Sequence, residues 1–338
     1  MRRIAFAALF FLLIAPGSSL AVSQSSAEYS ASVPEKIIFD TDIGDDIDDA
    51  FALALLLQSP EVKILGVTTA WGDTNLRARL VSRFLRETGH SDIPVFSGTE
   101  TKSAAKFSQA QWAGQSPERR YPDAVSFMLD TIRRYPGEVT LVSVAPFTNV
   151  GALISRDAST FRKLKRVVIM GGSVYRGYGD TGYAPGHGPE AEYNIYSDIS
   201  SSKKLFTADV PIYMMPLDST QIPLDEVRRD ELFSHGTAMT DALTLLYHQW
   251  SAANRTPTPT LFDAMAAAYA IRPELCPVKP MHIEVDDKGF TRPAPGTPNA
   301  EVCLNSDVQQ FYDFYMPRVL KPGTLSIEQT RRDSSAHP

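Results

Sequence analysis

Apolar runs of strand length alternate with amphipathic stretches of helix length along most of this chain of 338 residues. The strand-length runs are apolar throughout, which is typical of a sheet covered on both faces. Repeated strand–helix order predicts an α/β fold with a doubly wound, mainly parallel (mixed) sheet flanked by helices, a Rossmann-like open sheet. The expected strands are residues 36–39, 62–69, 94–97, 139–144, 166–170, 212–217, 282–285 and 302–305, and the expected helices are 48–58, 75–87, 123–134, 199–207, 240–253 and 261–271.

The first residues are expected to lie outside this fold. Two arginines precede an apolar run, residues 4–15, and small residues follow it. This order predicts a signal peptide over residues 1–21, with cleavage at residue 21 or as late as residue 27, and a protein exported to the periplasm or secreted. The apolar run is much shorter than the roughly 20 residues that span a bilayer, so no stable membrane anchor is expected. Residues 34–325 are then expected to form a single domain.

The charge of the chain limits the partners that it can bind, and its two cysteines bear on disulfide formation. The chain carries 33 basic and 39 acidic residues, a formal net charge of -6, and its Lys and Arg residues are scattered. Because a protein that binds duplex DNA or RNA needs a basic surface to displace counterions, no nucleic-acid polymer is expected as a partner. Cys276 and Cys303 are the two cysteines. Export to an oxidising compartment predicts that they form a disulfide, and two buried free thiols are the alternative.

Polar residues cluster where the expected strands end, which is where open α/β sheets bind ligands. Six aspartates lie within ten residues at the end of the first strand: Asp40, Asp42, Asp45, Asp46, Asp48 and Asp49. One or two could cap a helix, but six repel one another unless a cation compensates their charge. Carboxylates are hard oxygen ligands, so Ca²⁺ or Mg²⁺ is the natural candidate. An EF-hand is excluded, since its fifth position would be Gly44 and its twelfth, which must be Glu, would be Phe51.

Six short motifs, in this order, resemble those of a known family, the inosine–uridine-preferring nucleoside hydrolases. The first is residues 40–44 (DTDIG) with 47–50 (IDDA), which looks like the N-terminal signature of the family. The others are 66–69 (GVTT) with 72–73 (GD), 145–149 (APFTN), 168–172 (VIMGG), 192–194 (EYN) and 262–264 (FDA). The resemblance implies an enzyme that hydrolyses the N-glycosidic bond of ribonucleosides to free base and ribose. It also implies a homo-oligomer, either a dimer or a tetramer.

Carried over residue by residue, the resemblance assigns a role to each matching side chain. It implies a Ca²⁺ ion held by Asp42, Asp49, the backbone carbonyl of Thr148, and Asp263. Asp42 would also be the general base that acts on a water molecule. Asp48 would accept from the ribose 2′-hydroxyl, Glu192 and Asn194 would hold other sugar hydroxyls, and Met170 would line the ribose. These residue types suit the reaction, because carboxylates stabilise the positive charge that develops on the ribosyl group as the bond breaks.

The chain departs from the family pattern beside the metal and the ribose. Asp45 and Asp46 are extra residues between Gly44 and the Asp48 carboxylate, so they are second-choice metal ligands. Asp73 stands where the family often has Asn. Its extra negative charge is expected to tune the ribose contacts or to bind in the outer shell of the metal.

A third departure concerns the leaving base. Phe262 precedes Asp263, where members of the family carry a histidine thought to protonate the base. His248 is one candidate to supply the missing proton, although a lone histidine on a helix is more often a surface or packing residue. Phe262 and Trp250 are candidates for stacking on the base.

Two other function classes remain open at this stage. A haloacid-dehalogenase-type phosphatase also begins with an apolar strand that ends in Asp-x-Asp, here Asp40 and Asp42, but it leaves the later motifs unexplained. A catalytically inactive, calcium-dependent protein that binds nucleosides or sugars would account for the missing histidine. The intact Asp42 argues against an inactive protein.

Overall fold

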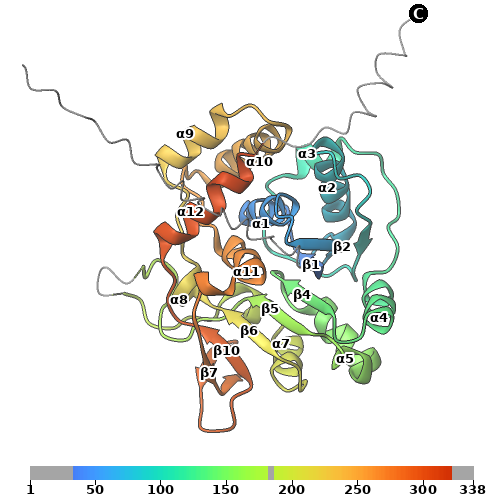
Figure 1. Ribbon diagram of the computed structural model, residues 1–338, viewed down its shortest axis with the longest axis vertical. Coiled ribbons are helices and arrows are strands. Elements are labelled where there is room, and N and C mark those ends of the chain that lie inside the picture. The colour runs from blue at the N-terminus through green and yellow to red at the C-terminus, as the bar shows by residue number, and fades with distance from the viewer. Residues whose placement is uncertain (1–32, 182–185, 322–338) are drawn as a thin grey trace, which may run out of the picture. The chain divides into compact units, whose positions relative to one another are not determined.

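A central sheet of eight strands organises the structure, a computed structural model that describes residues 33–181 and 186–321 (Figure 1). In spatial order its strands are β3 (Val95–Ser97), β2 (Val62–Thr69), β1 (Glu35–Thr41), β4 (Val139–Ser143), β5 (Arg166–Met170), β6 (Ile212–Met215), β10 (Ala300–Cys303) and β7 (Val278–Met281). Neighbouring strands are parallel except β7, which is antiparallel to β10. β8 (Ile283–Val285) and β9 (Thr291–Pro293) form a separate hairpin. The predicted doubly wound, mainly parallel α/β sheet is confirmed.

Helices connect the strands and cover the sheet. In the described part of the chain they are α1 (Asp48–Leu57), α2 (Thr74–Glu87), α3 (Ala110–Gly114), α4 (Ala124–Arg134), α5 (Thr148–Phe161), α6 (Tyr193–Ser197), α7 (Ile199–Phe206), α8 (Leu217–Thr220), α9 (Glu226–Ser234), α10 (Ala238–Asn254), α11 (Phe262–Ile271) and α12 (Val308–Val319). A short 3-10 turn, Pro273–Leu275, follows α11. The helices α1 and α11 lie side by side although more than 200 residues separate them in the chain (Figure 1).

The sheet has a hydrophobic core on each face, as the continuously apolar strands predict. Successive side chains of a strand point to opposite faces, so Phe39 belongs to one core and its neighbour Ile38 to the other. The Phe39 core is completed by α1, α2, α10, α11 and α12, and the Ile38 core by α4, α5 and α7. Burial on both faces leaves the strand ends as the places where polar side chains can meet a ligand.

The chain leaves the centre of the sheet in two directions. From β1 it proceeds through β2 to β3 on one side, and from β4 through β5 to β6 on the other. The carboxyl ends of β1 and β4 therefore flank the point at which the strand order reverses, where open α/β sheets bind their ligands. Buried Asp40 fixes these two strand ends, since its carboxylate accepts hydrogen bonds from Asn149 Nδ2 (2.8 Å), Thr68 Oγ1 (2.7 Å) and Ser143 Oγ (3.1 Å).

The strand predictions hold in the main sheet and fail at its C-terminal edge. The segment predicted as a strand over 282–285 forms β8, which belongs to the separate hairpin and not to the main sheet. The edge strand β7 was not predicted, because Lys279 and Pro280 interrupt its apolar pattern and are exposed. The helices α5, α9 and α12 were also not predicted. The helix α5 has non-helical backbone at Asp157, α9 has a largely polar sequence, and α12 contains Pro317.

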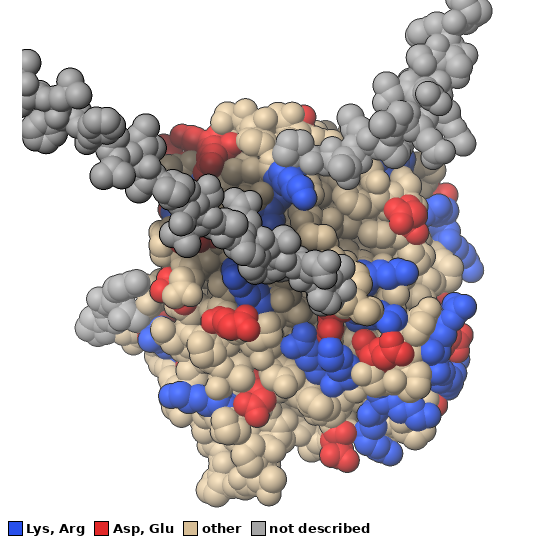
Figure 2. All heavy atoms as spheres, viewed as in Figure 1, with Lys and Arg blue, Asp and Glu red and all other residues tan. Residues whose placement is uncertain are grey.

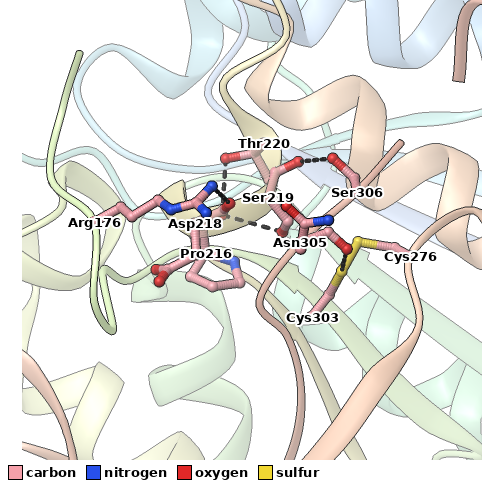
Figure 3. Close-up of a disulfide and its surroundings, with 9 residues drawn as sticks. All are labelled: Arg176, Pro216, Asp218, Ser219, Thr220, Cys276, Cys303, Asn305 and Ser306. Atoms are coloured by element: carbon pink, nitrogen blue, oxygen red, sulfur yellow. Dashed lines mark hydrogen bonds between the residues drawn. A yellow bond between two sulfur atoms is a disulfide. The ribbon is translucent and has the colours of Figure 1, made fainter. Parts of the chain in front are cut away.

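Cys276 and Cys303 form a disulfide, as predicted (Figure 3). Both are fully buried, and the bond ties the turn after α11 to the end of β10. Just beyond Cys303, Ser306 Oγ donates to the carbonyl oxygen of Ser219 on α8 (2.6 Å). The disulfide therefore anchors a segment that holds α8 in place.

Charges of both signs are interspersed on the face shown in Figure 2. In the part of the chain that the structure covers, no helix is long and apolar enough to cross a membrane. The predicted signal peptide lies outside the described residues. The residues that the structure describes belong to a compact unit that begins at Val33.

Candidate active site

A cavity of about 350 Å³ lies at the carboxyl end of the sheet, beside the β1 and β4 strand ends. Its lining residues form three groups. Six are aspartates: Asp42, Asp45, Asp46, Asp48, Asp49 and Asp263. Four lie at the end of β4 or β5 or at the start of α6: Val144, Met170, Glu192 and Asn194. The remaining seven are Ala105, Lys106, Tyr178, Tyr193, Trp250, Asn254 and Phe262.

Four buried carboxylates come from three different elements. Asp42 directly follows β1, Asp48 and Asp49 begin α1, and Asp263 is the second residue of α11. The backbone N–H of Asp263 donates to the Asp48 carboxylate (3.2 Å), so the N-termini of α1 and α11 meet at the cavity. Their helix dipoles favour negative charge at this point.

Three of these carboxylates lie close enough to share one ion. Oxygen atoms of Asp48, Asp49 and Asp263 are within 4.8 Å of one another. The expected ligand Asp42 lines the same cavity but is outside this set of three. The Asp49 carboxylate also accepts a hydrogen bond from Thr41 Oγ1, at the end of β1.

Burial raises the pKa of these carboxyl groups, and the charges of their neighbours raise it further. The strongest repulsion comes from Asp49 for Asp42, and from Asp48 for both Asp49 and Asp263. A cation among them would relieve this repulsion. Aspartate oxygens are the ligands that hard divalent cations prefer, so the donor set fits Ca²⁺ or Mg²⁺.

The structure does not bring Thr148, whose carbonyl was expected as a ligand, into the cavity. Thr148 is the first residue of α5 and is not among the lining residues. Val144, which directly follows β4, lines the cavity instead. Its carbonyl oxygen accepts a hydrogen bond from Asn194 Nδ2 (3.2 Å). Val144 therefore stands in the cavity wall where Thr148 was expected.

The residues expected to hold the sugar are gathered at one wall of the cavity. Asn194 Nδ2 donates to the carbonyl oxygens of Val144 and Met170 (3.1 Å), and buried Met170 lies beside it. Glu192 caps α6, and its carboxylate accepts from the backbone N–H groups of Gly172 (2.8 Å) and Asn194 (2.9 Å). Burial raises the pKa of Glu192, and these donors oppose the rise.

Two expected site residues lie elsewhere. Asp73 is exposed and caps α2, where its carboxylate accepts from the backbone N–H of Leu76 (2.9 Å). Helix capping, the ordinary role of an aspartate at this position, thus accounts for it. His248 is exposed on α10 and packs against Phe233 and Tyr247, outside the cavity.

Aromatic rings form the opposite wall. The expected residues Phe262 and Trp250 both line the cavity, and Phe262 meets the Tyr178 ring edge to face, with centroids 6.0 Å apart. Sequence reasoning missed Tyr178, which lies in a loop without a motif, and Tyr193, which stands inside the 192–194 motif but was given no role. Tyr178 Oη accepts from the backbone N–H of Tyr193 (3.1 Å). Of the residues that the structure describes, no histidine lines this cavity.

The geometry removes the basis for a phosphatase. That chemistry needs the first aspartate of Asp-x-Asp, Asp40, as an accessible nucleophile. The Asp40 side chain is fully buried, has three hydrogen-bond donors, and does not line the cavity.

Sequence comparisons agree with the geometry. The model of the inosine-uridine preferring nucleoside hydrolase family matches residues 37–313. The chain is 30% identical to the pyrimidine-specific ribonucleoside hydrolase RihA of Citrobacter koseri, across 84% of this chain and 97% of that protein. It is 32% identical to the uncharacterized protein C1683.06c of Schizosaccharomyces pombe, in a match that covers 55% of this chain and 62% of that protein.

The fold is also that of a solved structure, a plant nucleoside hydrolase described as the PpNRh1 enzyme. The two superpose with a TM-score of 0.75 and 24% sequence identity, over 86% of this chain and 100% of that one. The family match spans most of the chain, from β1 to α12. The chain therefore belongs to the inosine–uridine-preferring nucleoside hydrolase family and is an enzyme that hydrolyses N-glycosidic bonds of nucleosides.

Proposed function

We propose that this enzyme is a Ca²⁺-dependent hydrolase that converts ribonucleosides to free base and ribose, with Asp42 as the general base. One observation carries the proposal. Asp42, Asp48, Asp49 and Asp263 converge from separate elements on the cavity that Glu192 and Asn194 also line. A single cavity thus combines the donors for a hard cation with the polar groups for a sugar. The family is generally metal-dependent, which supports the same conclusion.

The ion would be held by the carboxylates of Asp42, Asp49 and Asp263 and by the carbonyl oxygen of Val144. When bound, Ca²⁺ orients a water molecule and the sugar diol and lowers the pKa of the water. Asp42 takes a proton from the attacking water while the water oxygen forms a bond to C1′ of the ribose. The C1′–N bond breaks, and its electron pair leaves with the base.

The other carboxylates act on the sugar. Asp48 accepts from the ribose 2′-hydroxyl, and Glu192 and Asn194 hold the remaining hydroxyls, with Met170 beneath the ring. Positive charge develops on the ribosyl group as the bond to the base breaks, and carboxylates nearby stabilise it. At the base, Phe262, Tyr178 and Trp250 offer stacking surfaces instead of a histidine proton donor.

A panel of nucleosides tests the proposal. Release of free base and ribose from inosine, uridine, adenosine and cytidine is measured before chelation, after exhaustive chelation, and after Ca²⁺ is restored. We expect hydrolysis to stop on chelation and to return with Ca²⁺. Full activity after chelation would contradict the metal dependence, whereas nucleoside binding without release would identify an inactive binding protein.

Substitution of the general base, Asp42, gives a second test. Asp42→Asn should keep the fold and lose several orders of magnitude in turnover, because base catalysis and metal binding fail together. Turnover within tenfold of wild type, a barrier change of only about 1.4 kcal/mol, would reject Asp42 as the base.

We also propose that the protein is exported after cleavage of its N-terminal segment and that it assembles as a dimer or tetramer. The N-terminal sequence pattern and the buried disulfide support export. N-terminal sequencing of the mature protein and light scattering after gel filtration test the two statements.

A further inference from the structure

We propose that Arg77, held by Asp45, is a positioning residue of the active site that fixes the turn after β1 and sets a positive charge beside the carboxylates. The turn comprises residues 42–45 and joins Asp42 to the start of α1. The inference rests on the proposed function, because it concerns how the chain prepares Asp42 and Asp49 for Ca²⁺.

The Arg77 side chain reaches from α2 to the turn and is almost completely buried, with 1% of it exposed. Its guanidinium donates hydrogen bonds to the turn and to Trp71, just before α2. Nη1 donates to the carbonyl oxygens of Asp42 and Ile43 (3.1 Å for Ile43), and Nη2 donates to the Asp45 carboxylate (2.7 Å). Nε donates to the carbonyl oxygen of Trp71 (2.7 Å). A planar guanidinium can serve these acceptors together, whereas a lysine ammonium has neither the fork geometry nor enough donors.

The turn is also fixed from its other side. Gly44 has φ +127°, and the Phe107 ring packs so closely that a Cβ at Gly44 would lie 2.0 Å from it. The same ring lies 5.1 Å from the Arg77 guanidinium. Ser108 Oγ donates to the carbonyl oxygen of Asp45 (2.8 Å). The turn is therefore clamped between α2 and the segment before α3, and Asp42 has little freedom to move.

The charge of Arg77 acts on the carboxylates that the mechanism uses. The Arg77 guanidinium donates to the backbone carbonyl of Asp42 and to the Asp45 carboxylate, so its positive charge lies at the turn that carries the Asp42 side chain. Asp45, one of the two residues inserted relative to the family pattern, forms the ion pair that allows the guanidinium to remain buried. A buried charge without a partner costs several kcal/mol, so the pair works as a unit.

Arg77→Lys tests the inference, with Arg79→Lys as the matched control. Arg79 is on the same helix, is partly buried, and also donates to two backbone carbonyl oxygens, but these belong to Gly114 and Ser116 and not to the turn after β1. Calorimetry with Ca²⁺ alone gives the metal affinity, and steady-state kinetics give kcat and KM separately. We expect Arg77→Lys to weaken Ca²⁺ binding at least tenfold and to lower kcat more than it raises KM, while Arg79→Lys changes neither by more than twofold.

Asp45→Asn keeps the shape of the partner and removes its charge, so it serves if Arg77→Lys does not fold. We expect it to weaken Ca²⁺ binding three- to tenfold, with the fold preserved by circular dichroism. Variants at Arg77 or Asp45 whose Ca²⁺ affinity and kcat match those of Arg79→Lys would overturn the inference and leave the proposed function intact. A wild-type enzyme that binds no Ca²⁺ would overturn both.

Discussion

At the scale of single residues, Asp49 is one of the three carboxylates that lie close enough to share an ion. It shares the cluster of three carboxylate oxygens, it is buried at the start of α1, and Thr41 holds its orientation. Asp49→Ala should therefore lose bound Ca²⁺ and at least 100-fold in kcat/KM, about 2.7 kcal/mol of transition-state stabilisation. Asp130→Ala, at an exposed position of α4, is the control that should change neither. Metal content by mass spectrometry and the rate of base release check the prediction, which retained metal and activity in Asp49→Ala would contradict.

Departure of the nucleobase is expected to depend on Phe262, which lines the cavity at the position where a proton donor was expected. Phe262→His should add an ionisation near pH 6–7 to the profile of kcat/KM and change the preference between inosine and uridine, because a histidine titrates in this range. His248→Ala, outside the cavity, should leave the profile unchanged. Wild type should favour a nucleoside whose leaving group is chemically activated. If that substrate shows no advantage over inosine, departure of the base is not the difficult step and the argument fails.

The sequence motifs predicted which acidic side chains gather at the cavity. Asp42, Asp49, Asp263 and Glu192 all line the cavity, because each stands in a motif at a strand end or a helix start. A backbone carbonyl was expected from Thr148, which does not line the cavity. Any residue type can present a carbonyl, and only the path of the chain shows which residues line the site.

Similar ambiguity explains why Asp73 and His248 were expected at the site but do not line the cavity. An aspartate before a helix serves equally well as a cap or as a ligand, and a helix histidine gives no sign of the face on which it lies. Arg77 was overlooked for a related reason. Its buried contacts are with backbone carbonyls and with one aspartate of the inserted pair, and neither forms a recognisable pattern in the sequence.

At the scale of secondary structure, the site depends on how closely α11 approaches α1. Every residue from Asp263 to Ala270 in α11 is buried, and five of these eight are alanine, so the two helices can pack with their N-termini together. Ala267→Leu should overpack this contact and lower the free energy of unfolding by about 1–3 kcal/mol. Ala252→Leu, at an exposed position of α10, is the matched control and should change it by less than about 0.5 kcal/mol. Urea unfolding with Ca²⁺ present measures both, and equal stabilities would contradict the packing argument.

Elements in the centre of the sheet were predictable because burial on both faces forces a run of apolar residues, as in β5. The edge strand β7 lacks this constraint and could not be recognised. The helix α5 was hidden for a different reason, since it contains the non-helical Asp157 and its pattern is broken there.

At the scale of the whole molecule, the buried carboxylates make stability depend on pH and metal together. Burial raises the pKa of Asp40 to about 6 and raises that of Asp42, Asp48, Asp49 and Asp263, against about 4 in an unfolded chain. Between these values the folded state binds more protons than the unfolded state, so the metal-free enzyme should lose stability as pH rises from about 4 through 6. Asp40 alone should lower the free energy of unfolding by an amount on the order of 3 kcal/mol as pH rises through this range.

Calcium should reverse this trend, because it binds the ionised carboxylates and only in the folded state. Chemical unfolding at pH 5, 6.5 and 8, with chelator or with saturating Ca²⁺, checks the prediction. We expect the stabilisation by Ca²⁺ to grow with pH. A metal-free enzyme that is more stable at pH 8 than at pH 5 would contradict the assignment of these carboxylates as buried and repelling.

The order of the last strands has a consequence for how the protein is made. β7 is synthesised before β10 but lies outside it, so β7 can join the sheet only after β10 has paired with β6. Until residue 303 has been synthesised, the edge of β6 therefore has no partner strand, and an unpaired edge of this kind invites association with other chains. A ribosome that stalls or terminates before Ala300 would release an aggregation-prone product. Oxidation of Cys276 and Cys303 would in turn mark the nascent chains that have completed the sheet.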